Sequence, residues 1–203
     1  MMASEQHSGR KGNKKTMIAS AVIVVFALAV FSGVLPQIRE ALYSSGILTS
    51  SPPEEIAGPP LSQEAWQFRL PADETNGGAF QLSEAEGEVL MLTYWASWCS
   101  TCRQTNPTLQ TLSEAVRHRD DIRILMLSMD SVPDNARRYL EDARIDIPNF
   151  FPGGELPPPL RMPVIPTTYV IDKSGQIVYR NTGYENYSRP GFQEWIIELA
   201  ENR

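Results

Sequence analysis

An apolar run that leads directly into the chain's two cysteines constrains the fold more than any other feature. Residues 89–95, VLMLTYW, are too few to cross a membrane and have the composition of a strand buried on both faces. Cys99 and Cys102 follow, at the start of a segment, residues 100–117, that we expect to be helical. Because strands buried on both faces occur where helices cover a sheet, this order predicts an α/β fold. The cysteines should lie where a strand passes into a helix.

The sequence from residue 63 to residue 203 continues this alternation of strand and helix patterns. Strands are expected at residues 65–70, 79–82, 89–95, 122–128, 167–171 and 176–180, and helices at residues 100–117, 133–144 and from Pro190 onward. The last helix carries apolar residues at the spacing of one helical face, which should pack on the sheet. Trp95, Met126 and Met129 are expected in the core.

Residues 152–166 break the pattern. They contain six prolines, which lack the N–H groups of a strand ladder, and so predict a loop. The loop either shapes a groove for a partner beside Pro166 or serves as a rigid connector.

The first 62 residues have the composition of an anchor and a tether. Residues 17–35 form a run of 19 uncharged residues, close to the roughly 20 that cross a bilayer as a helix. Four bases and one acid precede it, so residues 1–16 should be cytoplasmic and the rest extracytoplasmic. The proline- and serine-rich residues 36–62 predict a flexible linker to the domain of residues 63–203. The expected location is the cell inner (cytoplasmic) membrane, single-pass, with the domain on the periplasmic side.

A cleaved signal peptide is the alternative for the same segment. Ala27-Leu28-Ala29 has the small-residue pattern of a cleavage site. The apolar run continues beyond it to Leu35, which favours an uncleaved signal-anchor.

The charge of the remaining chain limits its partners. Without the bases and the acid of the first 35 residues, 14 basic and 23 acidic residues remain, a formal charge of −9. Nucleic acids and anionic membrane surfaces require basic patches, so nucleic acid is not an expected partner.

Two of the roles open to a Cys-x-x-Cys pair are poorly supported. A structural zinc site needs four ligands, and the pair supplies two. His7 lies across the expected membrane, and His118 belongs to a charged helix end. A structural disulfide would close a very short loop and stabilise little. We therefore expect neither a metal nor another cofactor.

Thiol–disulfide exchange explains the placement of the pair. If the helix begins near Ser100, Cys99 lies at its N-terminus, where free N–H groups and the helix dipole stabilise a thiolate. Such a setting lowers the pKa of a cysteine from about 8.5 to roughly 3.5–7.5. Cys102 lies one turn further along and further inside. An exposed attacking sulfur and a protected second sulfur are what exchange requires.

These motifs resemble the thioredoxin superfamily. The resemblance is carried by YWASWC-x-x-C after an apolar strand, by Pro107 after the second cysteine, and by IPTTYVID at residues 165–172. Together with the N-terminal anchor, they are most similar to the TlpA/ResA-like extracytoplasmic branch, over residues 63–203. The resemblance implies a thioredoxin fold, in which helices flank a central mixed β-sheet.

The resemblance also implies roles at the site. Cys99 would be the nucleophile and Cys102 the resolving thiol of a redox-active disulfide, which a cis-proline at Pro166 faces. The backbone of Ile165 would then be free to pair with an extended client segment. Trp98 is either a platform for the substrate or a cover over the dithiol.

Two positions depart from the family pattern. Thr93 stands where related thioredoxins carry a buried acid, and Thr105 stands where ResA-like members carry a glutamate. The proton acceptor for Cys102 therefore stays open between water and a hydroxyl relay through Thr93, and Thr93 can equally be an ordinary strand residue. The reduction potential cannot be carried over either.

The function expected is a membrane-anchored thiol–disulfide oxidoreductase that reduces protein disulfides outside the cytoplasm. The family suggests cysteine-containing clients such as apocytochrome c, hence a role in cytochrome c biogenesis, and a membrane dithiol as electron donor. The alternatives are a disulfide-donating oxidant and a metallochaperone that holds Cu(I) between the two thiolates.

Overall fold

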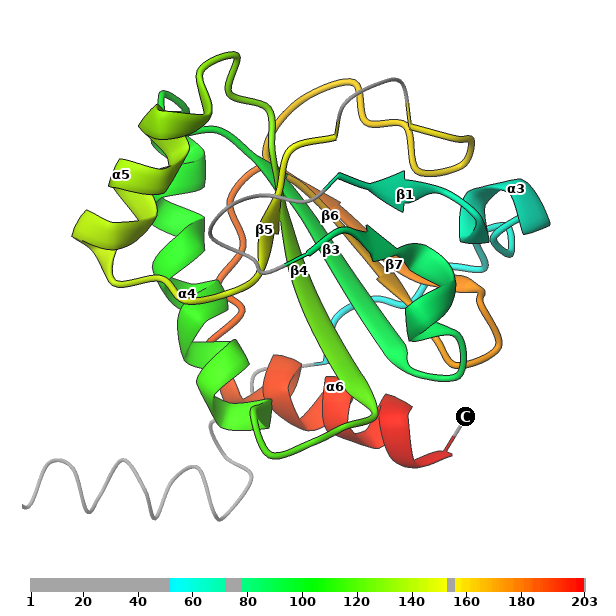
Figure 1. Ribbon diagram of the computed structural model, residues 1–203. Coiled ribbons are helices and arrows are strands. Elements are labelled where there is room, and N and C mark those ends of the chain that lie inside the picture. Colours follow the sequence, from blue (N-terminus) through cyan, green and yellow to red (C-terminus); the bar gives the residue numbers. More distant parts are fainter. Residues whose placement is uncertain (1–51, 72–77, 153–155, 203) are drawn as a thin grey trace, which may run out of the picture. The chain divides into compact units, whose positions relative to one another are not determined.

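A mixed five-stranded sheet forms the centre of the domain (Figure 1). The structure is a computed structural model that describes residues 52–71, 78–152 and 156–202. The strand order is β5-β4-β3-β6-β7, in which β3, β4 and β5 are parallel and β6 and β7 are antiparallel to their neighbours. The strands are β3 Val89–Trp95, β4 Ile122–Ser128, β5 Asn149–Phe150, β6 Thr167–Ile171 and β7 Ile177–Thr182.

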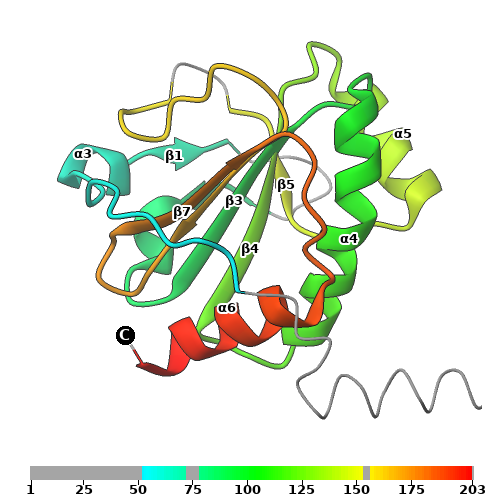
Figure 2. The same ribbon diagram turned by 180° about the vertical axis from the view of Figure 1, so that it is seen from behind.

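Three long helices contribute to the core on one face of this sheet. They are α4 Ser100–Val116, α5 Pro133–Ala143 and α6 Pro190–Asn202. Because strand side chains alternate between faces, Met91 and Trp95 of β3 join the core that these helices share. The views from both sides show α4 and α6 running against the sheet (Figures 1 and 2).

Shorter elements cover the opposite face. Leu90, Leu92 and Tyr94 of β3 pack there in a second core. The covering elements are α3 Gln63–Trp66, β1 Arg69–Leu70, β2 Phe80–Gln81 and the 3-10 helix η1 Leu82–Ala85. With cores on both faces, all seven residues of β3 are buried, as the apolar run predicts.

The expected α/β architecture with a mixed sheet is confirmed, with local differences. Residues 65–70 were expected to form one strand, but Ser62 caps a short helix first, since its Oγ accepts from the N–H of Ala65 at 3.2 Å. Only Arg69–Leu70 are then left to pair with β2. β5, two residues long, was not expected, because two residues are too few to show a period.

The N-terminal segment 52–61 lies along the edge of the sheet, although the sequence places it in the linker. The N–H of Ile56 donates to the carbonyl of Val178 at 2.8 Å, and that of Gly58 to Ile177 at 3.0 Å. A Cβ on residue 58 would lie 2.6 Å from the Ile177 oxygen, so glycine permits the close approach. The edge carbonyls of β7 thus hold a segment that composition alone describes as extended and solvated.

The predicted anchor, residues 17–35, and the linker before residue 52 lie outside the described residues. Within the part of the chain that the structure describes, no helix is long and apolar enough to span a membrane.

Candidate active site

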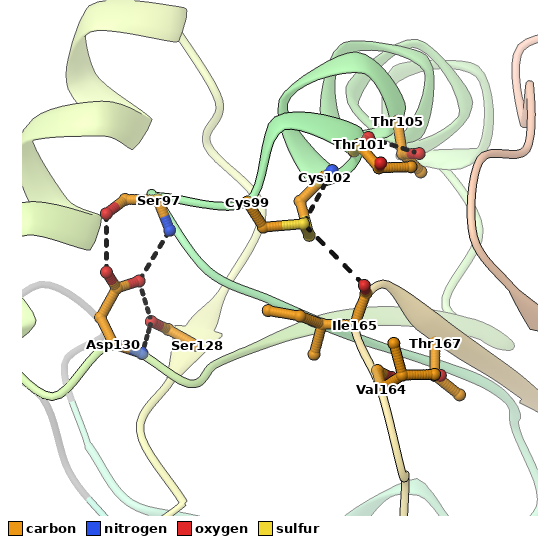
Figure 3. Close-up of a disulfide and its surroundings, with 10 residues drawn as sticks. All are labelled: Ser97, Cys99, Thr101, Cys102, Thr105, Ser128, Asp130, Val164, Ile165 and Thr167. Atoms are coloured by element: carbon orange, nitrogen blue, oxygen red, sulfur yellow. Dashed lines mark hydrogen bonds between the residues drawn. A yellow bond between two sulfur atoms is a disulfide. The ribbon is translucent and has the colours of Figure 1, made fainter.

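Cys99 and Cys102 lie where β3 ends and α4 begins, and they form a disulfide (Figure 3). Cys99 is the N-cap of α4 and adopts an extended backbone conformation, while Cys102 is in the first helical turn. The N–H of Cys102 lies 3.1 Å from Cys99 Sγ and points to it. In the reduced chain the same N–H, together with the helix dipole, would stabilise a thiolate on Cys99.

The two sulfurs differ in their access to solvent. Cys99 retains 8% of its surface, whereas Cys102 retains none and lies in the core between α4 and the sheet. The expected asymmetry, with Cys102 further inside than Cys99, is therefore present. A partner disulfide can reach Cys99 first.

The loop that precedes β6 lies beside the disulfide. The peptide bond between Ile165 and Pro166 is cis, as the resemblance implies, and Pro166 directly precedes β6. The Ile165 carbonyl oxygen lies 4.0 Å from Cys99 Sγ. Thr167 Oγ1 donates to the Val164 carbonyl at 2.7 Å and holds the loop in place. The structure thus joins two segments that are 66 residues apart in sequence.

An open groove of about 550 Å³ runs along Cys99. Its lining is largely apolar and comes from Trp98, Cys99, Ser100, Met129, Met162, Pro163, Val164 and Ile165. The proline-rich loop therefore forms one wall beside the cis peptide.

Trp98 lines this groove beside Cys99 and is 69% exposed, so most of its ring is available for contact with a substrate. Met129, expected in the core, is instead 36% exposed at the groove, because it follows the last residue of β4. Trp95 and Met126 are fully buried as expected.

Threonine hydroxyl groups occupy the two positions where the resemblance implies acids. Thr93 is fully buried, and its Oγ1 lies 3.0 Å from Thr168 Oγ1 in a hydrogen bond between β3 and β6. Thr105 is also fully buried, and its hydroxyl donates to the Thr101 carbonyl at 3.1 Å. Burial raises the pKa of Tyr187, beside Thr168, above its usual value, so this phenol stays neutral. Both threonines are thus satisfied by neutral partners.

Sequence reasoning missed one acid at this end of the sheet. Asp130, two residues beyond β4, is 9% exposed, and both of its carboxylate oxygens accept hydrogen bonds from Ser97, in the loop before Cys99. A signal was present, because polar residues that follow a buried strand lie at the end of the sheet where α/β sites form.

Known proteins resemble this chain in sequence and in structure. The AhpC/TSA family model matches residues 61–180. Thiol-disulfide oxidoreductase ResA of Oceanobacillus iheyensis is 26% identical over 113 residues, which are 55% of this chain and 58% of that protein. Thiol:disulfide interchange protein DsbE of Vibrio cholerae is 32% identical over 137 residues, which are 66% of this chain and 71% of that protein.

Solved structures confirm the fold. A thiol:disulfide interchange protein of the thioredoxin family from Chlorobium tepidum superimposes with a TM-score of 0.54 at 18% identity, over 74% of this chain and 96% of that one. StoA of Bacillus subtilis superimposes with a TM-score of 0.53 at 18% identity, over 66% of this chain and 98% of that one.

These matches confirm the expected thioredoxin-like fold and the expected similarity to ResA. The names of the two sequence relatives agree with the expected class of enzyme, a thiol–disulfide oxidoreductase. The matched residues 61–180 contain both cysteines and the cis-proline. The family model covers more than half of the chain, which therefore belongs to the AhpC/TSA family.

Proposed function

We propose that the chain is a membrane-anchored thiol–disulfide oxidoreductase that reduces disulfides of cysteine-containing protein clients outside the cytoplasm. The observation that carries the proposal is the pair of sulfurs itself. One sulfur caps a helix beside an open groove, and the other is buried behind it. The relatives' names support the chemistry, and the apolar residues 17–35 support the anchor.

The reaction proceeds by two exchanges. The Cys99 thiolate attacks a client disulfide, a mixed disulfide forms, and the first client thiolate leaves. Cys102 then loses its proton and attacks Cys99 Sγ, so that the Cys99–Cys102 disulfide forms and the second client thiolate leaves. The client gains two electrons, and the chain ends in the disulfide form seen in the structure. A dithiol carrier in the membrane would return two electrons.

The groove supplies the binding part of the proposal. The Ile165 carbonyl, next to Cys99 Sγ, offers a backbone acceptor to an extended client strand. Trp98, Met129 and Val164 are exposed around it and offer apolar contacts to the residues that flank the client cysteines. Clients with an exposed, flexible Cys-containing segment, such as a Cys-x-x-Cys-His haem-attachment peptide of an apocytochrome c, fit this arrangement.

The direction of exchange can be tested by mixing the reduced full chain with an equimolar, disulfide-bonded Cys-x-x-Cys-His peptide. We expect the peptide to become reduced while the chain acquires the Cys99–Cys102 disulfide, which alkylation and mass measurement detect. If the disulfide form instead oxidises the reduced peptide, the chain is a disulfide donor. If the chain exchanges with neither the disulfide-bonded nor the reduced peptide but binds Cu(I) stoichiometrically, it would be a metallochaperone.

Replacing Trp98 with alanine tests the groove. We expect KM for the client peptide to rise about tenfold, because a buried aromatic contact contributes on the order of 1–2 kcal/mol. The rate toward a small disulfide such as oxidised glutathione should change less than about twofold, since that substrate does not extend along the groove. Equal losses with both substrates would show that Trp98 acts on the dithiol and not on client binding.

A further inference from the structure

The loop between β3 and α4 is held by one carboxylate (Figure 3). Asp130 Oδ2 accepts from the N–H of Ser97 at 2.9 Å, and Oδ1 accepts from Ser97 Oγ at 2.6 Å. Ser97 lies two residues before Cys99, so this bidentate contact fixes the backbone that delivers the attacking sulfur to the N-cap of α4.

Asp130 is in turn fixed to the end of the sheet. Ser128 Oγ donates to Asp130 Oδ2 at 2.9 Å and also lies 3.1 Å from the N–H of Asp130, which points to it. Ser128 pairs with Trp95 in the last register position of β3 and β4, and the N–H of Met129 donates to the Trp95 carbonyl at 2.8 Å. The contact is therefore a rigid connection from the sheet to the cysteine loop.

We propose that Asp130 is a positioning residue for disulfide exchange. Its carboxylate holds Ser97 so that Cys99 Sγ stays within reach of both the Cys102 N–H, at 3.1 Å, and the groove beside Ile165. In-line attack on a disulfide depends on the placement of the sulfur, and a displacement of about 1 Å can lower a rate by up to about a hundredfold. The inference rests on the proposed function and adds a residue to it.

The fold provides a matched control. Asp172 is 4% exposed, and its Oδ1 accepts from the N–H of Ser174 at 3.0 Å, from Ser174 Oγ at 2.6 Å and from the N–H of Gln176 at 3.0 Å. It therefore holds the β6–β7 turn much as Asp130 holds the cysteine loop. Ile171, just before it, pairs with Leu90 near the start of β3, so the turn lies at the opposite end of the sheet from the disulfide.

The experiment compares the reduced full-length wild type with Asp130→Ala, Asp130→Asn, Asp172→Ala and Ser97→Ala. For each chain, the second-order rate constant toward oxidised glutathione and the melting temperature are measured. Asp130→Ala and Asp172→Ala should melt lower by similar amounts, because each loses a buried carboxylate that accepts several hydrogen bonds. Asp130→Ala should react about tenfold more slowly than wild type, whereas Asp172→Ala should react within about twofold of it.

Two further variants separate positioning from general stability. Asp130→Asn keeps one oxygen acceptor for Ser97 and should recover part of the lost rate. Ser97→Ala removes only the hydroxyl group and should lower the rate constant a few-fold. The double variant Ser97→Ala/Asp130→Ala should react no more slowly than Asp130→Ala, because both changes break the same contact. If Asp130→Ala does not fold, the rate constant of Ser97→Ala relative to wild type tests the same contact.

Equal rates for Asp130→Ala and Asp172→Ala, in a wild type that does exchange, would overturn the positioning role and leave the proposed function standing. A wild type that does not exchange with glutathione or with the client peptide would overturn the proposed function itself.

Discussion

Replacing Cys99 with serine is expected to lower the rate of disulfide reduction by roughly a thousandfold or more, because a hydroxyl is a far weaker nucleophile than a thiolate at a helix N-terminus. Replacing Cys102 with serine leaves Cys99 accessible in the groove and removes the buried sulfur that resolves the mixed disulfide. The Cys102→Ser chain should therefore accumulate a covalent complex with a disulfide-bonded client, seen by non-reducing electrophoresis.

The two sulfurs of the reduced wild type provide the control. At mildly acidic pH, an alkylating reagent should label Cys99 before Cys102, since Cys99 is both more exposed and nearer the free N–H groups of the helix. If Cys102 is labelled first, or if Cys99→Ser is the variant that traps clients, the roles of the two cysteines are reversed.

Replacing Thr105 with glutamate, the residue that the resemblance implies at this position, should destabilise the fold. The Thr105 side chain is fully buried. A carboxylate placed there by Thr105→Glu loses its hydration, so its pKa in the folded chain should rise above the unfolded value of about 4.3. We expect a loss of about 3 kcal/mol in the free energy of unfolding at neutral pH.

The sign of the pH dependence identifies the cause. The unfolded chain releases the proton at a lower pH than the folded chain does, so the loss should be smallest below about pH 4 and should grow as pH rises toward the folded pKa. Thr105→Gln has the same size without the charge, and its loss should not vary with pH. Denaturant unfolding of both variants between about pH 4 and 7 makes the comparison. A loss for Thr105→Glu that is equal at every pH would mean that the carboxylate is hydrated or paired.

The sequence predicts the inner strands of the fold closely. β3, β4 and β6 match their expected bounds, because each is rich in apolar residues that the two cores bury. The placement of Cys99 at the helix N-terminus follows from the same pattern, since a strand must end before the helix starts. For these elements, the apolar composition of each segment correctly predicts its burial in the sheet.

The remaining features depend on contacts between distant segments. The two residues of β5 are strand only because β4 lies beside them. The edge pairing of residues 52–61 depends on the open side of β7, which no property of that segment reveals. The place of Asp130 after β4 could be noted in the sequence, but its contact with Ser97 depends on the pairing of β3 with β4. The cis peptide bond before Pro166 was predicted from the family resemblance, because a proline in the sequence does not by itself indicate a cis bond.

The equilibrium reduction potential of the Cys99–Cys102 couple, in the full chain, tests the central claim most directly. It can be measured by equilibration in glutathione or dithiothreitol buffers, followed by alkylation and mass measurement of the two forms. We expect a single two-electron transition below about −200 mV, toward the thioredoxin value of about −270 mV, as befits a reductant. A value near the roughly −120 mV of DsbA would make the chain a disulfide donor, and the lack of a reversible transition would contradict exchange altogether.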